Sequence, residues 1–289
     1  MVINEAVCEG CGDCGLASNC LAVLPVETEF GRKRAINQSS CNLDFTCSDG
    51  FCPSFVSVVG GSVRRGQADT SLITPAMLAA LPDPQGQNHG PKLNGTRNIL
   101  LSGVGGTGVT TVSALLAMAA HMDGMPATTL DLTGLTPKGG AVLSHVRIAP
   151  QPQVLGAVRI DTGGARLLLA ADMVVAAGAQ AIAMVDPESA RVVVNSHEIP
   201  TAISTLTPDG DLHAAELRAR LRDSVGAGRS DFADARAIAT PLFGDSLASN
   251  LFLLGFPLQT GFIPRDLAPP ATGIAVERAA GQGAFATPT

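Results

Sequence analysis

The chain has 289 residues, 46% of them hydrophobic, and carries a formal net charge of −6. This length and apolar content suffice for one large domain or two unequal ones, and the acidic balance argues against nucleic acid as a partner. The first residues lack the basic segment and apolar run of a signal peptide. We therefore expect a cytoplasmic protein whose cysteines serve metal binding or redox chemistry rather than disulfides.

A group of cysteines dominates the start of the chain, because all seven lie within the first 52 residues. Cys8, Cys11 and Cys14 follow one another with two residues between each pair. A four-iron cluster takes three thiolates from such a loop and a fourth from a distant cysteine that is typically followed by proline. Cys52 precedes Pro53 and meets that requirement. The spacing therefore predicts a 4Fe–4S cluster held by Cys8, Cys11, Cys14 and Cys52.

Three further cysteines, Cys20, Cys41 and Cys47, have spacings that depart from the ferredoxin pattern. They could hold a 3Fe–4S cluster, or a second 4Fe–4S cluster with Asp44 or Asp49 as the fourth ligand. One or two of them could also be buried thiols. Zinc is the main alternative for the whole region. It is disfavoured because structural zinc sites usually combine two cysteine pairs, whereas this sequence has a third closely spaced cysteine and a terminal Cys-Pro.

Changes in composition predict the domains. Residues 1–59 form a small Cys-rich ferredoxin-like iron–sulfur domain, which depends on its metal because it shows little apolar periodicity. Residues 60–96, rich in Pro and Gly, form a linker with a short helix over Pro75–Leu81. Residues 97–264 form a Rossmann-like domain, and residues 265–289 form an irregular tail.

Beyond residue 97, short apolar runs alternate with helical patterns, which predicts an α/β fold with a Rossmann-like, mostly parallel sheet. Ala141–Ile148 alternates like a strand with one solvated face. Met173–Ala177 and Val192–Asn195 are continuous apolar runs typical of strands buried on both faces. The other expected elements are strands over Ile99–Leu101, Thr128–Asp131 and Ser230–Asp234, and helices over Val109–His121, Asp211–Val225, 235–243 and 245–261.

A glycine-rich turn follows the first of these strands. Gly103, Gly105 and Gly108 have the spacing of the dinucleotide-binding fingerprint and lie between a strand and a helix, as that fingerprint requires. With Gly106 they permit close approach of an anionic ligand to a helix N-terminus. Asp131 ends a later strand, where a ribose-binding carboxylate would lie. These residues predict either NAD(P) or FAD binding, or a Rossmann-like sheet whose turn packs against a partner without a dinucleotide. The uncharged stretch around the turn is too rich in glycine to span a membrane.

Several other polar residues carry weaker signals. We expect His145 to be packed or at the surface rather than a ligand, and Lys138–Gly140 to form a turn rather than an anion site. Asn195 and His197 follow a strand at its carboxyl end, where α/β folds gather ligands. Lining a pocket is therefore a hypothesis for these two residues and, more weakly, for Asp234.

Five motifs stand in one order along the chain: Cys8-Glu-Gly-Cys11-Gly-Asp-Cys14, Gly50-Phe-Cys-Pro-Ser-Phe55, Gly103-Val-Gly-Gly-Thr-Gly108, Lys138-Gly-Gly-Ala-Val-Leu-Ser-His145 and Gly244-Asp-Ser-Leu-Ala-Ser-Asn250. In these motifs the chain resembles bacterial fused indolepyruvate ferredoxin oxidoreductases. The first two are similar to the ferredoxin-type segment of that family, and the other three to its gamma domain. The resemblance covers most of residues 1–264.

This resemblance implies oxidative decarboxylation of an aryl 2-oxoacid such as indolepyruvate. Thiamine diphosphate with Mg²⁺ stabilises the carbanion, CoA takes the acyl group, and iron–sulfur clusters pass electrons to ferredoxin. The resemblance also lowers the weight of the nicotinamide interpretation, because the glycine loop of this family is not a recognised nicotinamide site.

One departure limits what the chain can do alone. A thiamine site needs Gly-Asp-Gly, and Ser48-Asp-Gly50 and Pro208-Asp-Gly210 lack the first glycine. We therefore expect the electron-transfer and gamma portion of such an enzyme, either a subunit or an interior piece, that is inactive without a thiamine diphosphate-binding partner. The alternatives are an NAD(P)- or FAD-dependent oxidoreductase that feeds an iron–sulfur domain, and a scaffold whose cysteines hold zinc.

Overall fold

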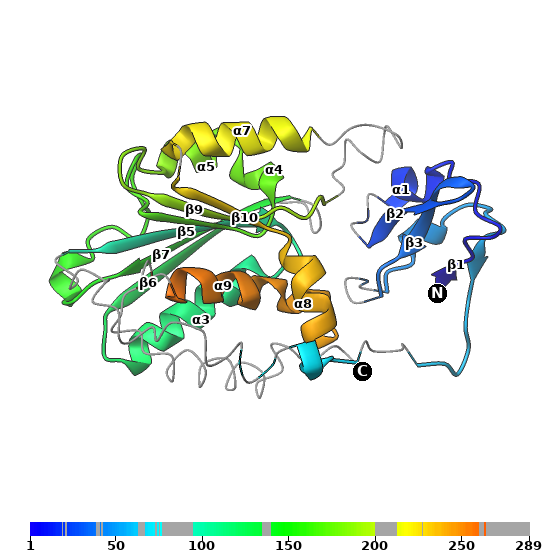
Figure 1. Cartoon of the computed structure of the whole chain (residues 1–289), viewed down its shortest axis with the longest axis horizontal. Helices are drawn as coiled ribbons and strands as arrows, with labels where there is room; N and C mark the ends of the chain where they lie inside the picture. Colours follow the sequence, from blue (N-terminus) through cyan, green and yellow to red (C-terminus); the bar gives the residue numbers. More distant parts are fainter. Residues whose placement is uncertain are drawn as a thin grey trace.

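The computed structural model describes residues 1–18, 20, 22–38, 41, 43–62, 67–72, 74, 76, 95–134, 140–199, 213–226, 228–259 and 263. Its largest part is a six-stranded sheet with the strand order β10-β9-β8-β5-β7-β6 (Figure 1). The strands are β5 (Arg97–Val104), β6 (Ala127–Thr133), β7 (Ala141–Ile148), β8 (Leu167–Ala170), β9 (Arg191–Asn195) and β10 (Ser230–Ala233). The predicted α/β fold is confirmed for this part of the chain.

The sheet is mostly parallel, as predicted, but it contains one reversed strand. β10, β9, β8 and β5 pair in parallel, whereas β7 is antiparallel to both β5 and β6. Chain length explains the reversal, because only residues 134–140 separate β6 from β7. A parallel crossover needs a dozen or more residues. Since β5, β8, β9 and β10 run the same way, their carboxyl ends meet at one edge of the sheet.

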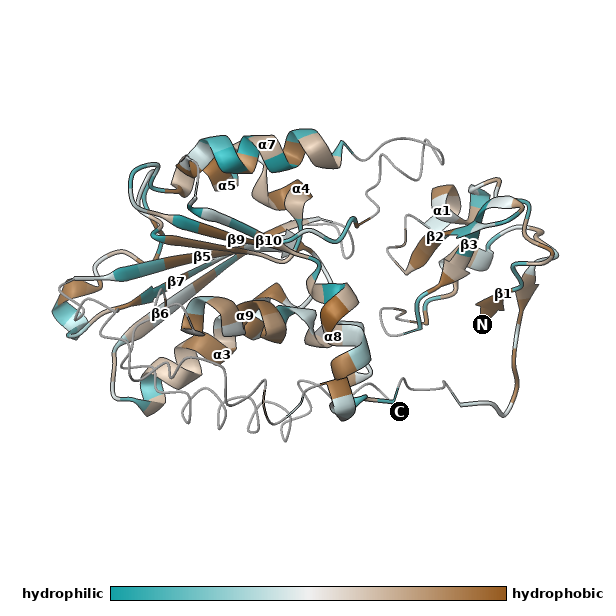
Figure 2. Ribbon diagram, viewed as in Figure 1, coloured by the Kyte–Doolittle hydropathy of each residue, from teal (hydrophilic) through white to brown (hydrophobic). Residues whose placement is uncertain are grey.

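Helices cover both faces of this sheet (Figure 1). One face carries α3 (Val109–Met122) and α9 (Ser249–Gln259), and the other carries α4 (Met173–Ala176), α5 (Ala179–Met184) and α7 (Ala214–Val225). Along β5, Ile99 and Leu101 pack into the first layer and Leu100 into the second, as the two-residue period of a strand requires. Figure 2 shows the apolar strands in the middle and the mixed polar and apolar surface of α7 outside.

The solvated face that we predicted for Ala141–Ile148 is wrong. Five consecutive residues of β7, from Val142 to Val146, are buried. The physical reason is the position of β7 between β5 and β6, where helices cover both sides. His145 is consequently a packed residue with 0% exposure, which is one of the two environments that the sequence suggested for it.

The strand that we predicted over Met173–Ala177 is also wrong. Residues Met173–Ala176 form the short helix α4, and the neighbouring strand is β8, which precedes it. Asp172 explains why this segment is a helix and not a strand. Its Oδ1 accepts a hydrogen bond from Val175 N at 2.9 Å, so its side chain caps the N-terminus of α4. The local cap outweighs the strand preference of the two valines.

The other predicted helices are found with small shifts at their ends. α8 (Ala235–Phe243) begins after Asp234, whose Oδ1 accepts from Ala237 N at 2.8 Å. The helix predicted over 245–261 is divided into the 3₁₀ turn η4 (Ser246–Ala248) and α9. A further 3₁₀ turn, η3 (Pro152–Val154), lies between β7 and β8.

The cysteine-rich part contains two small sheets. β1 (Val2–Ile3) pairs with β4 (Phe55–Val56), and β2 (Val23–Thr28) forms a hairpin with β3 (Gly31–Ile36). The helix α1 (Asp13–Ser18) packs against the 3₁₀ turn η1 (Thr46–Ser48). The core of this part consists largely of cysteines: Cys20, Ala22 and Val23 are buried, with Cys14, Ile36, Cys41 and Cys47 packed around them. Its few apolar contacts agree with the lack of apolar periodicity in the sequence.

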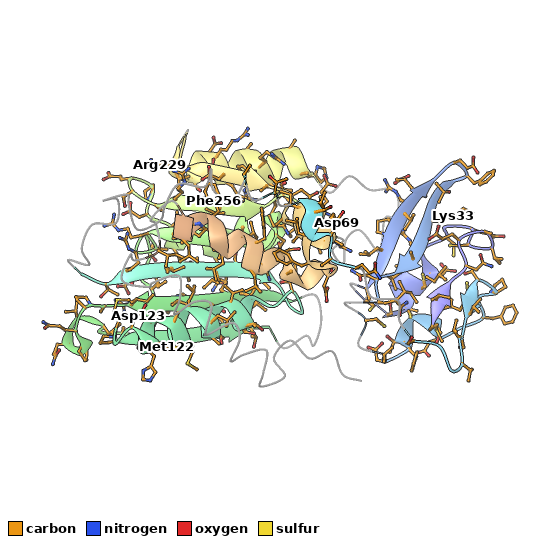
Figure 3. The ribbon with its side chains drawn as sticks, turned by 60° about the horizontal axis from the view of Figure 1, so that its bottom comes forward. Lys33, Asp69, Met122, Asp123, Arg229 and Phe256 are labelled. Atoms are coloured by element: carbon orange, nitrogen blue, oxygen red, sulfur yellow. The ribbon has the colours of Figure 1, made fainter. Side chains whose placement is uncertain are left out.

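The connecting segment touches the α/β part through η2 (Thr70–Leu72), which packs against α8. Asp69 N donates to Pro241 O at 2.9 Å, and Asp69 lies beside that helix in Figure 3. The helix predicted over Pro75–Leu81 and the tail over residues 265–289 lie outside the described residues, apart from Ala76. Within the part of the chain that the structure describes, no helix is long and apolar enough to cross a membrane.

Candidate functional site

Three cysteines at the start of the chain lie around the beginning of α1. Gly10 and Gly12 separate them and have left-handed φ angles of 75° and 84°, which bend the loop between the thiols. Gly10 is also required for packing, because a Cβ there would overlap Arg32 O on β3. Cys8 is buried and its Sγ accepts a hydrogen bond from Gly10 N at 3.4 Å. The loop therefore turns sharply between the three cysteines, and their role as cluster ligands stays a prediction.

A second set of cysteines lies next to the first. Cys47 lies on η1, and Cys20, Cys41 and Cys47 share the small core of this part with Cys14. Burial raises the pKa of Cys47, and the charges of Cys20, Cys41 and Asp44 add to that effect. The structure therefore brings together the three cysteines that the sequence left over, with Asp44 close by. Among the described residues, the charge of Asp49 is not one of those that act on Cys47.

Cys52 lies just before β4, which pairs with β1. Asn4 N donates to Ser54 O at 2.7 Å, and Cys8 N donates to Asn4 O at 2.9 Å. Cys52 is exposed, and its Sγ is 2.9 Å from Ser54 Oγ. Asn4 therefore links the backbone of Cys8 to the backbone of the segment that carries the fourth predicted ligand.

The thiols do not converge on one point. Among the described residues, no three Cys, His, Asp or Glu side chains are arranged to hold a single metal ion. An iron–sulfur cluster makes a different demand, because each thiolate binds a different iron and the ligands surround the cluster. All seven cysteines are free of disulfides. Among the described residues the arrangement is thus not a one-ion site, and the cluster ligands stay a prediction from the spacing.

The glycine turn joins β5 to α3, and packing explains its glycines. A Cβ on Gly103 would lie 2.6 Å from Val109 Cγ2 and 2.9 Å from Ala171 Cβ. Gly106 and Gly108 have backbone φ angles of 93° and 87°, which residues with a side chain rarely adopt. The glycines therefore let β5, α3 and the segment after β8 approach closely, whether or not a ligand binds here.

Three segments from distant parts of the chain hold this turn. Gly105 N donates to Gly140 O at 2.8 Å, and Val104 N donates to Asp172 Oδ2 at 2.6 Å. Asn250, at the start of α9, donates through Nδ2 to Thr107 O. Gly140 ends the predicted Lys138–Gly140 turn, whose other two residues lie outside the described residues. The motifs that the sequence singled out at 103–108, 138–145 and 244–250 thus meet in one place.

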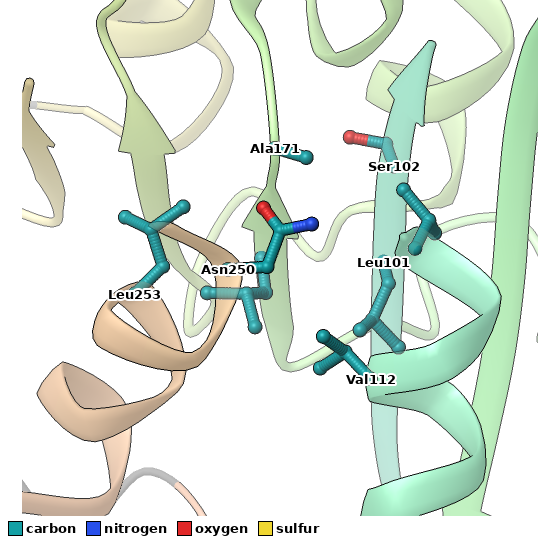
Figure 4. A pocket seen from close by; sticks show the side chains of 8 residues that line it. Leu101, Ser102, Val112, Ala171, Asn250 and Leu253 are labelled. Carbon is teal, nitrogen blue, oxygen red and sulfur yellow. The ribbon is translucent and has the colours of Figure 1, made fainter. Parts of the chain in front are cut away.

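A small pocket of about 10 Å³ lies beside the turn, between α9, α3, β5 and β8 (Figure 4). It opens where the connections from β5 and β8 leave in opposite directions, the position at which α/β sheets bind ligands. Leu101, Val112 and Leu253 supply much of its apolar lining, and its polar groups are Ser102 and Asn250. A lining of this kind suits a small apolar group better than a dinucleotide phosphate.

The structure does not bring Asp131 to the glycine turn. Asp131 lies within β6, opposite Ser144 of β7, and Ser144 in turn is opposite Leu101 of β5. Two strand spacings of about 4.8 Å each therefore separate β6 from β5. In the dinucleotide fold the carboxylate follows the strand next to the glycine turn. The reversed strand β7 occupies that position here.

The residues expected at the carboxyl ends of β9 and β10 do come together. Asn195 Oδ1 accepts from His197 N and from Ala235 N, both at 3.1 Å. His197 Nδ1 lies 3.5 Å from Asp234 Oδ1, and His197 Nε2 lies 3.2 Å from an Arg236 nitrogen. The cluster satisfies its own polar groups and joins β9 to α8. None of these residues lines the pocket in Figure 4.

His145 is a buried histidine, and its surroundings in the folded protein favour the neutral form of its ring. Its Nδ1 accepts a hydrogen bond from Ile160 N at 3.1 Å, and within the described part of the chain its Nε2 has no partner. Burial lowers the pKa of His145, the charge of Arg159 lowers it further, and Asp131 opposes both. Protonation would remove the acceptor that holds Ile160.

We expect acid to destabilise the α/β part through His145. In the unfolded chain His145 has the usual histidine pKa of 6.5, whereas in the folded chain its pKa is lower. The free energy of unfolding should therefore fall as the pH drops below 6.5, by up to about 1.4 kcal/mol per pH unit. Urea unfolding at pH 7.5 and 5.5 measures this difference, and it should shrink in His145→Gln. An equal difference in the variant would contradict the assignment.

Two residues at these sites were missed by sequence reasoning. Arg34 is buried and its charge acts on Cys14, and Asp172 holds both β5 and α4. Asp172 had a usable signal, since an aspartate directly before an apolar run is a common helix cap. Arg34 had no signal of that strength, because Cys14 is distant in sequence. Asn250 belongs to the 244–250 motif, but the sequence did not indicate its hydrogen bond to Thr107.

Comparison with known proteins gives consistent matches for the α/β part. The sequence profile described as pyruvate ferredoxin/flavodoxin oxidoreductase matches residues 98–279. The indolepyruvate oxidoreductase subunit IorB of Archaeoglobus fulgidus is 30% identical over 162 residues, which are 55% of this chain and 74% of that protein. The cysteine-rich part precedes the residues that the profile matches.

Two solved structures are similar in fold. The pyruvate oxidoreductase subunit PORC of Thermotoga maritima is 16% identical with a TM-score of 0.43, and the match covers 66% of this chain and 96% of that one. The keto/oxoacid ferredoxin oxidoreductase gamma subunit of Geobacter sulfurreducens is 20% identical with a TM-score of 0.40, and the match covers 63% and 85%.

Proposed function

Because the chain belongs to the pyruvate ferredoxin/flavodoxin oxidoreductase family, we propose that it is the electron-transfer and gamma portion of an indolepyruvate (aryl 2-oxoacid):ferredoxin oxidoreductase. It would carry electrons from a thiamine-dependent oxidative decarboxylation to ferredoxin. The thiamine diphosphate and Mg²⁺ belong to a partner subunit or domain, and CoA accepts the acyl group there. The observation that carries the proposal is the pair of thiol sets next to an α/β domain of this family.

The thiols suit iron–sulfur clusters in number and surroundings. Cys8, Cys11, Cys14 and Cys52 would hold a 4Fe–4S cluster, with Gly10 N already donating to a ligand sulfur. Such a cluster accepts and releases one electron when bound.

The second set would hold either a 3Fe–4S cluster on Cys20, Cys41 and Cys47 or a 4Fe–4S cluster completed by Asp44. The charge of Asp44 acts on Cys47, and its Oδ1 accepts from Thr46 N at 3.3 Å, so the carboxylate folds toward η1. Cys14 packs in the same small core as this set, which supports a relay between the two proposed clusters.

The choice of indolepyruvate rests on the sequence. The motifs resemble indolepyruvate oxidoreductases, and the relative from Archaeoglobus fulgidus bears that name at 30% identity. The gamma domain would contribute packing surface to the larger enzyme. Its glycine turn is held by Gly140, Asp172 and Asn250, and the pocket beside it lacks charged lining residues among those described.

Metal analysis of the whole chain, purified without oxygen, tests the proposal. We expect a brown protein whose visible absorbance bleaches with dithionite. About eight iron atoms per chain would indicate two 4Fe–4S clusters, and about seven would indicate one 4Fe–4S and one 3Fe–4S cluster. The chain alone should not turn over indolepyruvate. A colourless protein that binds zinc and no iron after anaerobic reconstitution would refute the electron-transfer role.

A further inference from the structure

The two edges of the six-stranded sheet differ in how well they are protected (Figure 1). At one edge β10 is short, and its Asp231 forms an ion pair with Arg191 of β9 at 2.5 Å. At the other edge β6 has seven residues, and Thr129, Asp131 and Thr133 are exposed. This strand contains no Pro, Lys or Arg, and it pairs with β7 along its whole length without a bulge. Proteins normally use such features to protect an open edge, so β6 lacks the common protection.

The hydrogen-bond pattern shows which backbone groups of β6 face the open side. Ala149 N donates to Pro126 O at 3.0 Å, in the same register as the pairs between β6 and β7. Hydrogen-bonded pairs alternate along an antiparallel ladder, so the even-numbered residues of β6 bond to β7. The odd-numbered residues point their N–H and C=O groups outward, and they are Ala127, Thr129, Asp131 and Thr133. Among the described residues, no strand pairs with this side and no other backbone group bonds to it.

We propose that β6 pairs with β6 of a second copy of this chain, so that the two sheets join into one across a two-fold axis. A two-fold contact places the same strand on both sides of the interface, and an axis perpendicular to the sheet makes the two copies of β6 antiparallel. The contact uses the unpaired N–H and C=O groups of the open edge. The inference goes beyond the proposed function and does not depend on it, because it concerns only the α/β part.

Length and charge together select one register for this contact. With the axis at Leu130, every residue of β6 has a partner, and Thr129 lies opposite Asp131 of the second copy. The outward residues then form about eight N–H···O=C hydrogen bonds. Leu130 meets Leu130 of the second copy in a non-hydrogen-bonded pair, where side chains approach most closely.

Neighbouring registers are less favourable. An axis at Asp131 would place the two Asp131 carboxylates directly opposite each other, and like charges in that position are destabilising. An axis at Thr129 would leave Thr133 beyond the end of the opposing strand. The strand is therefore complementary to itself in one register, and this self-complementarity is the reason for choosing a second copy as its partner.

Sedimentation equilibrium of the whole chain, kept reduced and free of oxygen, tests the contact. The wild type should form a concentration-dependent dimer of twice 29.4 kDa. Thr129→Pro should be monomeric at concentrations where the wild type is dimeric, because it removes an outward N–H and leaves the bonds to β7 in place. Thr129→Ser keeps that N–H and is the matched control, which should dimerise like the wild type. Circular dichroism checks that both variants are folded.

An exchange of charges tests the register. Thr129→Asp places a carboxylate opposite Asp131 of the second copy, and the contact occurs twice in the dimer. Dimerisation should therefore weaken by about tenfold. Adding Asp131→Lys turns both contacts into opposite-charge pairs and should restore the dimer. These variants also decide the question if Thr129→Pro fails to fold.

The other outcomes overturn the inference. A wild type that stays monomeric at all concentrations would exclude self-pairing and leave the edge for a strand of another subunit. A dimer that a folded Thr129→Pro leaves intact would use a different surface. If Thr129→Asp has no effect, or if Asp131→Lys does not reverse it, the proposed register is wrong. The mass of the chain is measured separately from its iron content, so this inference and the proposed function can fail independently.

Discussion

Replacing Cys14 by serine should remove about half of the iron, and replacing Cys47 should remove much of the other half. The reason is the division that the cysteine spacing predicts, with one set around Cys8, Cys11 and Cys14 and another around Cys20, Cys41 and Cys47. Iron and acid-labile sulfide per chain measure the loss, and EPR identifies which signal disappears. The double variant should bind almost none.

Ser48→Ala is a suitable control, because Ser48 follows Cys47 on η1 and its hydroxyl donates to Phe45 O at 2.7 Å, close by in the same turn. It should keep the iron content of the wild type. The two-set arrangement is wrong if Cys14→Ser and Cys47→Ser lose the same EPR signal, since each set would then fail to hold a cluster of its own.

Replacing Asp172 by alanine should reduce the stability of the α/β part by about 2–5 kcal/mol. Its two carboxylate oxygens accept from Val104 N at 2.6 Å and Val175 N at 2.9 Å, and its exposure is 1%. Burial raises the pKa of Asp172 although the N–H groups of Val175, Val104 and Val174 oppose the shift. Removing the side chain leaves two buried N–H groups without an acceptor.

Urea unfolding followed by circular dichroism is the appropriate measurement, because the chain has no Trp or Tyr to give a fluorescence signal. Asp234→Ala supplies the comparison. Asp234 also caps a helix, but its side chain is 45% exposed, so its loss should cost only about 1 kcal/mol. If the two variants lose the same stability, the link between β5 and α4 contributes nothing beyond an ordinary cap.

The sequence predicted the elements whose signals are local. The helix after Gly108, the strand over Val192–Asn195 and the mostly parallel sheet all follow from apolar periodicity and turn residues. The solvated face of β7 was wrong because alternation cannot reveal which strand lies at an edge. The strand over Met173–Ala177 was wrong because five apolar residues suit either a strand or a helix, and the capping carboxylate of Asp172 favours the helix.

The candidate sites show the same limit. Cysteine spacing indicated the candidate ligands, because closely spaced cluster ligands form a local sequence pattern. The other residues around the thiols come from distant segments and form no such pattern. Arg34 lies on the β2–β3 hairpin, from which its charge acts on Cys14, and Asn250 donates to Thr107 only after the sheet is complete. Contacts between residues so far apart in sequence depend on the topology of the fold, which local sequence patterns do not reveal.

The hydrogen bond from Asn250 to Thr107 also has a consequence for how the protein is made. The two residues are separated by 143 positions, and Asp172 and Val104 are separated by 68. Contacts so far apart in sequence form late and slow the folding of a domain. During synthesis the glycine turn therefore stays incompletely held until the start of α9 has left the ribosome, whereas the cysteine-rich part has all of its thiols available some two hundred residues earlier.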